Sequence, residues 1–289
     1  MKRIALFAGL LGLSVLAFVL TKSEAQQNVA EIERVKDNLF VITGGGGNTA
    51  AFITQKGVVV VDTKLPGWGQ AILDKIKTVT DKPVTMIINT HTHQDHVGSN
   101  SEFPPTVEIV AHENCKASMD KMPLFQGEEK TKFLPHKTYK DKMSLLGGSE
   151  KIDLYYFGRG HTNGDTIIVF PALRVAHTGD LFAAKGTHLI DVNNGGSGIE
   201  YPKTLKKAAE GIKGVEVVIP GHNPVTDWNA FKEFGAFNQD FLSAVQQAFK
   251  EGKTADEAAA ALKLPDKYKD YVTKNLKDNV TKIYAELKQ

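Results

Sequence analysis

Cysteine is nearly absent from the sequence, because its 289 residues include only Cys115. A single cysteine excludes an intramolecular disulfide and a zinc knuckle built from CxxC pairs. Internal repeats and low-complexity segments are also missing, and 42% apolar with 24% charged residues is an ordinary globular composition. Disorder, collagen and coiled coil are thereby excluded, and the length suits one large domain or two small ones.

An excess of charge of one sign is missing once the first 25 residues are set aside. The whole chain has 35 basic and 33 acidic residues, and the first 25 contain three of the former (Lys2, Arg3, Lys22) and one of the latter (Glu24). The remainder, with 32 of each, is neutral. A neutral chain has no electrostatic attraction for nucleic acid or an anionic membrane, so we expect neither as a stable partner.

The first 25 residues have the pattern of a secretory signal peptide. Lys2 and Arg3 precede an apolar run at residues 4–20, and residues 23–25 (SEA) fit a small-x-small cleavage site. We expect export to a periplasm or the cell exterior, with cleavage near Ala25. The alternative is an uncleaved N-terminal membrane anchor, although such a run is at the lower limit of a bilayer span.

The part of the chain that follows the leader alternates short apolar segments with turns, which is typical of β-strands. In the first half, the glycine run at 44–47 predicts a hairpin with a mobile tip, and Ile72 and Ile76 mark a short helix. Residues 113–150 are polar, lysine-rich and ambiguous. The strands predicted in this half cover residues 39–43, 49–54, 57–62, 84–89 and 107–111.

The second half repeats this pattern and then becomes helical. It predicts a helix at 202–212 and strands at 152–157, 166–170, 173–177 and 215–219, the last strand of the chain. Apolar residues spaced by three and four then form one helical stripe: Phe231, Phe234, Phe237, Phe241, Val245 and Phe249. A final helix carries Tyr271, Leu276, Val280, Ile283 and Leu287. We expect both stripes to pack against a sheet, a membrane or partner face being the alternative.

These two successive blocks of strands and helices predict an α/β fold in which two β-sheets pack together with helices outside. Composition does not shift anywhere along residues 26–289, so we expect a single domain there.

Three of the nine histidines lie within six residues, in the segment HTHQDH at 91–96. In an extended segment residues i and i+2 point the same way, so His91 and His93 can hold one metal together. Asp95 and His96 follow as the chain turns, and they can face a second metal. A lone histidine is most often an ordinary polar residue, whereas three imidazoles crowded beside a carboxylate favour a cation.

Three further candidates lie at the ends of predicted strands or in tight turns: His161, Asp180 and His222. Each has a glycine beside it, which lets the backbone approach a site closely. Imidazole and carboxylate ligands without thiolate suit zinc, and also iron or manganese.

Taken together, the motifs HTHQDH (91–96), GHT (160–162), TGD (178–180) and PGH (220–222) resemble those of the metallo-β-lactamase-fold hydrolases. The resemblance runs from about residue 32 to about residue 225, and the motifs keep the family's order; the helices from about 226 to 289 follow it. It implies a four-layer αβ/βα sandwich of two mostly antiparallel or mixed sheets, with metals at one edge between the sheets.

The resemblance also implies a dinuclear site, which would hold two Zn²⁺ ions per chain. His91, His93 and His161 would bind the first metal, and Asp95, His96 and His222 would bind the second. Asp180 would bridge the two metals. Some antibiotic-resistance enzymes have cysteine or serine at this position, whereas the thioesterase and lactonase branches have aspartate. Asp62, after the VVVV segment, is interpreted as a structural hydrogen-bonding carboxylate beside the site.

This metal site predicts the reaction and its substrate. Two zinc ions would hold a hydroxide at neutral pH and polarise a carbonyl, while Asp95 would orient the nucleophile and pass its proton to the leaving group. Two dications, two carboxylates and one hydroxide leave a single positive charge, which favours a small-molecule substrate that carries a carboxylate. We therefore expect an exported hydrolase of a small amide or ester, such as a β-lactam or lactone.

Other functions remain open at this point. A thioesterase like glyoxalase II fits the motifs, although export argues against it. An iron-dependent sulfur dioxygenase on the same fold resembles a mononuclear site, and the complete second set of ligands argues against it. A non-catalytic binding protein would not need every ligand, and a nuclease would need basic residues. The sequence does not give the oligomeric state.

The remaining histidines are His112, His136, His177 and His188, and we expect ordinary core or surface roles for most of them. His188 precedes a glycine-rich loop at 193–198, which makes it the best further candidate for a substrate contact. Trp68 and the glycine hairpin are the other candidates for the mouth of the site.

Overall fold

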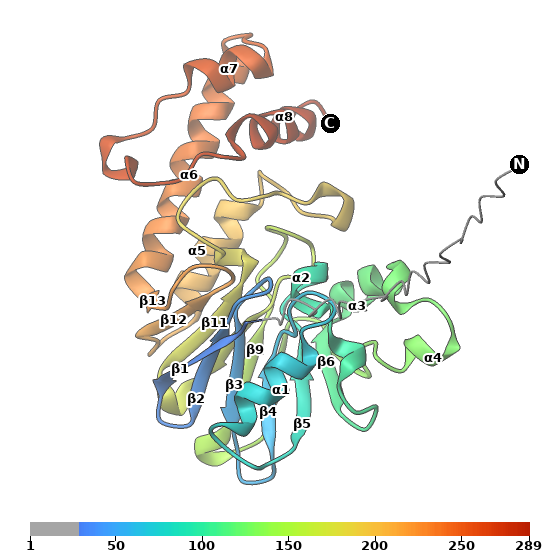
Figure 1. The fold of residues 1–289 in the computed structure, drawn as a ribbon. Helices are drawn as coiled ribbons and strands as arrows, with labels where there is room; N and C mark the ends of the chain where they lie inside the picture. Colours follow the sequence, from blue (N-terminus) through green and yellow to red (C-terminus); the bar gives the residue numbers. More distant parts are fainter. Residues whose placement is uncertain (1–28) are drawn as a thin grey trace, which may run out of the picture.

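The computed structural model describes residues 29–289, so the predicted leader and its cleavage site near Ala25 lie outside the described residues. Two mixed β-sheets form the centre of the molecule, and helices cover their outer faces (Figure 1). This is the predicted α/β architecture, and it confirms the two sheets with outer helices that the sequence pattern indicated.

The first sheet has seven strands in chain order. Strands β1 to β4 pair antiparallel, and β4 to β7 pair parallel. Helix α1 (Gly69–Lys77) makes the crossover from β4 to β5. The strands are β1 (Glu31–Lys36), β2 (Leu39–Thr43), β3 (Thr49–Ile53), β4 (Val58–Val61), β5 (Val84–Ile88), β6 (Glu108–His112) and β7 (Lys137–Tyr139).

The second sheet has six strands in the order β13-β12-β11-β10-β9-β8. Only β11 and β12 pair parallel, and helix α5 (Tyr201–Gly211) lies in the connection between them. The strands are β8 (Lys142–Leu145), β9 (Ile152–Tyr155), β10 (Ile167–Phe170), β11 (Val175–Gly179), β12 (Val217–Pro220) and β13 (Thr226–Asp227).

Strand β4 shows why these sequences are almost wholly apolar. Val59 and Val61 pack between the sheets, in the same cluster as Ile168 of β10, whereas Val58 and Val60 pack under helix α1. Successive residues of a strand point to opposite faces, so a strand covered on both sides is apolar at every position. The four valines are accordingly all buried.

Of the C-terminal helices, α6 (Trp228–Lys250) packs against the second sheet, whereas α7 (Ala255–Ala261) and α8 (Leu276–Leu287) lie beyond the sheet and pack on α6 and on each other (Figure 1). The predicted phenylalanine stripe lies on α6 and packs with residues of α5 and of the second sheet, which confirms the core interpretation. Among residues 29–289, no helix is both long and apolar enough to cross a bilayer.

The structure differs from the sequence expectations at several places. Strand β13 follows residues 215–219, so the prediction of a last strand there was wrong. Tyr271 precedes α8 instead of lying within it. The ambiguous segment at 113–150 folds into the helices α3 (Glu113–Met119) and α4 (Glu128–Thr131) together with strands β7 and β8. The short helix α2 (Gln94–Val97) precedes that segment and carries part of HTHQDH.

Candidate metal centre

All seven predicted site residues lie at one edge of the two sheets, where strands end. His91 and His93 follow β5, and Asp95 and His96 lie on the short helix α2. The other three residues come from the second half of the chain: His161 from the β9–β10 loop, Asp180 directly after β11 and His222 directly after β12. The fold thus brings together segments that are more than one hundred residues apart in sequence.

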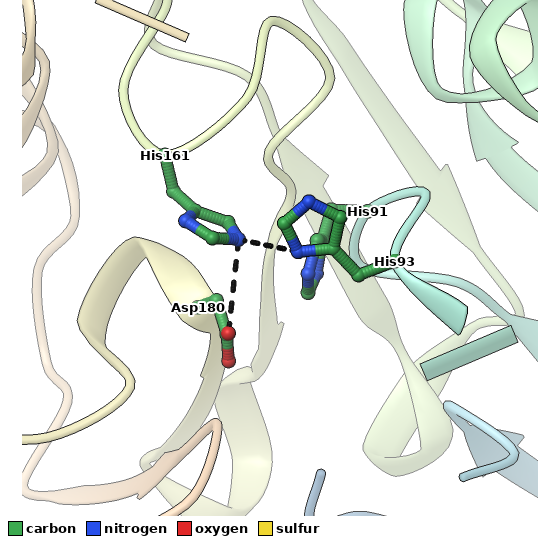
Figure 2. A group of neighbouring side chains, drawn as sticks. All are labelled: His91, His93, His161 and Asp180. Atoms are coloured by element: carbon green, nitrogen blue, oxygen red, sulfur yellow. Dashed lines mark hydrogen bonds and ion pairs between the residues drawn. The ribbon is translucent and has the colours of Figure 1, made fainter. Parts of the chain in front are cut away.

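The first group contains His91, His93, His161 and Asp180, each offering one ligand atom within 4.8 Å of the others (Figure 2). His93 Nδ1 lies 2.8 Å from His161 Nε2, and His161 Nε2 lies 3.7 Å from Asp180 Oδ2. His91 Nε2 and Asp180 Oδ1 are buried and form no hydrogen bond within the described residues. Buried polar atoms without partners are costly, and a cation between them would remove that cost.

The second group contains Asp95, His96 and His222, whose ligand atoms also lie within 4.8 Å of one another. His222 Nε2 lies 3.3 Å from Asp95 Oδ2 and 3.4 Å from His96 Nε2. Asp180 lies between the two groups, because its Oδ1 is 3.3 Å from His96 Nε2 and its Oδ2 is 3.3 Å from His222 Nε2. One carboxylate therefore adjoins both groups.

The opposite ring nitrogens of four site histidines are held by partners outside the two groups. His93 Nε2 donates to Asp191 Oδ2 at 2.7 Å, and His161 Nδ1 donates to the Leu189 carbonyl at 2.6 Å. His96 Nδ1 contacts Asp62 Oδ2 at 2.7 Å, and His91 Nδ1 contacts the Thr90 hydroxyl at 3.0 Å. Metal-binding histidines are oriented in this way, so these residues fit a metal site.

Asp62 has the structural role that its sequence position indicated. It is fully buried, and its two carboxylate oxygens accept hydrogen bonds from the Thr90 backbone N–H and the Thr90 hydroxyl in addition to the His96 contact. It therefore orients the His96 ring from behind and connects α2 to the end of β4.

Electrostatics sets the protonation of the site. Burial lowers the pKa of His91 and of His161 well below the ordinary histidine value, and the neighbouring imidazoles add to this effect. For Asp180, burial raises the pKa, but His96, His188 and His222 outweigh it and hold the pKa well below the ordinary value. Burial likewise opposes the charged form of His96, yet Asp180 and Asp62 raise its pKa. The neutral imidazoles of His91 and His161 beside the ionised carboxylate of Asp180 form a donor set for a cation.

The glycine hairpin between β2 and β3 packs directly on this site. A Cβ on Gly47 would lie 2.2 Å from His96 Cε1, and the Gly47 backbone N–H donates to the Asp95 carbonyl at 3.0 Å. The Trp68 ring covers Gly45 in the same way, since a Cβ there would lie 2.0 Å from it. The tip was predicted to be mobile, but these contacts seat it against α2 and Trp68.

Two of the other histidines have ordinary core contacts. His177 is buried between the Asn48 carbonyl and the Gly179 backbone N–H, and His112 caps α3 and donates to the Lys140 carbonyl. His136 is exposed. His188 alone among these four lies at the site, with Nε2 3.1 Å from Asp180 Oδ2.

Sequence reasoning missed Asp191 and Lys64. Asp191 has a local signal, because its side chain accepts from the backbone N–H groups of Asn193 and Asn194 and forms a turn typical of aspartate. Its contact with His93 spans 98 positions and leaves no trace in the local sequence. Lys64 is fully buried and donates to the carbonyls of Ile42 and Gly47, each at 2.8 Å.

Comparison with known proteins identifies the family. The family model described as the metallo-beta-lactamase superfamily matches residues 42–222, which include every candidate metal residue. The chain belongs to this superfamily. It is accordingly a metal-dependent hydrolase with the metallo-β-lactamase fold.

Individual relatives agree with this assignment. A "Metallo-beta-lactamase type 2" from Elizabethkingia meningoseptica is 26% identical over 235 residues, 76% of this chain and 88% of that protein. The structure of a metallo-beta-lactamase from Pontibacter korlensis superposes with a TM-score of 0.62 at 20% identity, over 73% of this chain and all of that one.

A second similar structure extends further along this chain. The sec-alkylsulfatase from Pseudomonas sp. superposes with a TM-score of 0.74 at 16% identity and covers 89% of this chain. This chain spans only half of the alkylsulfatase. The greater coverage shows that the likeness of fold continues beyond the family region, which ends at residue 222.

Proposed function

We propose that this superfamily member is an exported dinuclear zinc hydrolase that cleaves a small amide or ester, with a β-lactam or a lactone as its substrate. The observation that carries the proposal is the convergence of seven imidazole and carboxylate side chains in two adjacent groups that share Asp180. Imidazole and carboxylate donors suit zinc, with iron or manganese as the alternatives.

Each group would hold one zinc ion. His91, His93 and His161 would bind the first and Asp95, His96 and His222 the second, with Asp180 shared between them. Bound there, the zinc ions would supply an activated water and polarise the scissile carbonyl.

Asp95 is the residue placed to move a proton. Its carboxylate is 31% exposed, whereas the His96 side chain beside it is completely buried. It therefore adjoins both the site and the solvent from which substrate enters, and we assign it the transfer of a proton to the leaving group. His188 beside Asp180 is 19% exposed, and we assign it a contact with the substrate.

The charge of the site supports a substrate with a carboxylate. Two dications exceed the charge of Asp95, Asp180 and an activated water by one positive unit, which attracts an anionic group. A relative named as a metallo-beta-lactamase supports a lactam, whereas aspartate at position 180 supports a lactone or a thioester. A thioesterase like glyoxalase II is therefore the second candidate.

The predicted leader supports export with cleavage near Ala25. N-terminal sequencing of the protein from its native cell should begin near Gln26. Recovery of intact chain from Met1 in the soluble cytosol would refute export without affecting the proposed chemistry.

A hydrolysis screen tests the reaction. Zinc-loaded protein should be offered a β-lactam, a lactone, a thioester and a secondary alkyl sulfate, each with and without a carboxylate. We expect chelator-sensitive turnover of a carbonyl substrate, and faster turnover of the form with the carboxylate. Turnover confined to the alkyl sulfate, or none at all by fully loaded protein, would contradict the proposal.

A further inference from the structure

One loop, residues 184–198, contacts the first group, and we name it the site loop. Three of its residues reach that group. His188 Nε2 lies 3.1 Å from Asp180 Oδ2, the Leu189 carbonyl accepts from His161 Nδ1 at 2.6 Å, and Asp191 Oδ2 accepts from His93 Nε2 at 2.7 Å. The site loop thus orients three of the four members of the first group.

The site loop has almost no regular structure of its own, because only Val192–Asn194 forms a single helical turn. A loop without strand or helix hydrogen bonds must be fixed by other contacts if it is to hold side chains accurately. Residues 159–163 supply some of these contacts, because they bond the backbone of Asp191 and of residues 194–197. The C-terminal part of the chain supplies further ones, and α8 lies against the segment that leads into α5 (Figure 1).

Contacts from the C-terminal segment reach the beginning, the middle and the end of the site loop. At its beginning, Thr187 donates to the Val272 carbonyl at 2.8 Å, and Val272 donates to the Lys185 carbonyl at 3.1 Å. In the middle, Asn279 Nδ2 of α8 donates to the His188 carbonyl at 2.6 Å. All three bonds are made by His188 itself or by a residue at most three positions before it.

At the end of the site loop, one carboxylate of α8 accepts two hydrogen bonds. Glu286 accepts from the Gly198 backbone N–H at 2.7 Å and from the Ser197 hydroxyl. Bonds to an ionised acceptor are stronger than bonds between neutral groups. Gly198 also packs closely on α8, since a Cβ there would lie 2.4 Å from Ile283 Cγ1.

The burial of Asn279 indicates that its side chain serves the contact with the His188 carbonyl. It is only 3% exposed, and its Oδ1 has no hydrogen-bond partner among the described residues. A buried amide that leaves one atom unsatisfied is costly, and a leucine would pack in a helix core without that cost. The hydrogen bond that the Asn279 side chain donates goes to the carbonyl of His188, the residue that contacts Asp180.

We propose that Asn279 and Glu286 are positioning residues of the metal centre, which hold the site loop so that His188, Leu189 and Asp191 orient the first group. Both lie outside residues 42–222, the region shared with the superfamily. The metal centre of this chain is therefore completed by a helix beyond that region. The inference rests on metal binding by the first group, which is part of the proposed function.

Zinc affinity tests the proposal, measured by competition with a chromophoric chelator on the whole chain. We expect Asn279→Ala and Glu286→Ala each to weaken the tighter zinc-binding step by about tenfold or more. Without them the site loop would hold less firmly the Leu189 and Asp191 contacts that orient His161 and His93, and loss of such contacts lowers metal affinity. Glu286→Gln should weaken zinc binding less than Glu286→Ala, because the glutamine amide oxygen can still accept from the Gly198 N–H. The thermal midpoint of the metal-free protein should be recorded for every variant.

Thr254→Ala is the matched control. It removes the capping box of α7, in which Thr254 and Glu257 bond each other's backbone N–H groups, and it touches no residue of the site loop. It should lower the thermal midpoint and leave zinc affinity unchanged.

The outcomes separate this proposal from the function on which it rests. Wild-type affinity in both α8 variants would overturn it, and so would an equal loss in Thr254→Ala, because the effect would then follow from general destabilisation. A wild-type protein that binds no zinc would refute the proposed function itself. Weakened zinc binding confined to the α8 variants supports the proposal.

Discussion

Asp180 is the side chain at which the two groups meet, with one oxygen toward His96 and the other toward His222 and His161. Asp180→Asn keeps the volume and removes one negative charge from between the two proposed zinc ions. We expect a folded protein that retains one zinc and loses turnover by on the order of a hundredfold or more, about 2.7 kcal/mol in barrier. Metal content, circular dichroism and rates on the best substrate measure this; two metals and wild-type rates would require a new site assignment.

Gly47 is the residue at which the hairpin approaches the second group most closely. The added methyl of Gly47→Ala would lie 2.2 Å from His96 Cε1, so the ring or the hairpin must move. We expect weaker binding of the second zinc and a loss of about 1–3 kcal/mol in unfolding free energy. Gly147→Ala is the control, because a Cβ there meets nothing within 4 Å. Equal zinc affinity in the two variants would show that the close packing of Gly47 on His96 does not affect metal binding.

Lys64 provides a prediction that depends on pH. Burial lowers its pKa from 10.5 to about 7, although Asp62 acts in the opposite direction. Between these values the unfolded chain binds a proton that the folded chain does not, so the unfolding free energy rises with pH. Relative to Lys64→Met, wild type should therefore gain stability from about pH 7 to pH 10, by at most about 5 kcal/mol. Denaturant titrations at several pH values measure this difference, and a constant difference would contradict it.

At the scale of elements, the spacing of apolar residues predicted the strands and helices that have a regular buried face. Strand β4 was readable because both of its faces are buried, and the phenylalanine stripe of α6 because its spacing matches a helix. Strand β1 was missed, since its sequence EIERVK is charged and half exposed at the edge of a sheet. The two-residue strand β13 is too short to carry any periodic signal.

The candidate site divides in the same way. Its seven inner residues were predicted because they cluster in short motifs with glycine nearby. The outer contacts were not, because Asp191 with His93 and Asn279 with His188 join residues 98 and 91 positions apart. Such pairs depend on how the site loop and α8 pack, and a single sequence carries no record of that packing.

At the scale of the whole molecule, metal binding should contribute to folding stability. Anything that binds the native chain and not the unfolded one stabilises it, by about 4 kcal/mol at a thousandfold excess over the dissociation constant. Removal of zinc by a chelator should therefore lower the thermal midpoint, and returning zinc should restore it. Asp180→Asn should respond less than wild type, because it retains only one ion. A thermal midpoint that the chelator leaves unchanged would mean that the two groups hold no metal.

The central claim is that one chain holds two metals. Elemental analysis of the purified, zinc-loaded protein tests it most directly, with metal and protein concentration measured on the same sample. Seven converging ligands and a shared Asp180 predict a value near two zinc ions per chain. A stable value of one, in a protein with full activity, would contradict the dinuclear site.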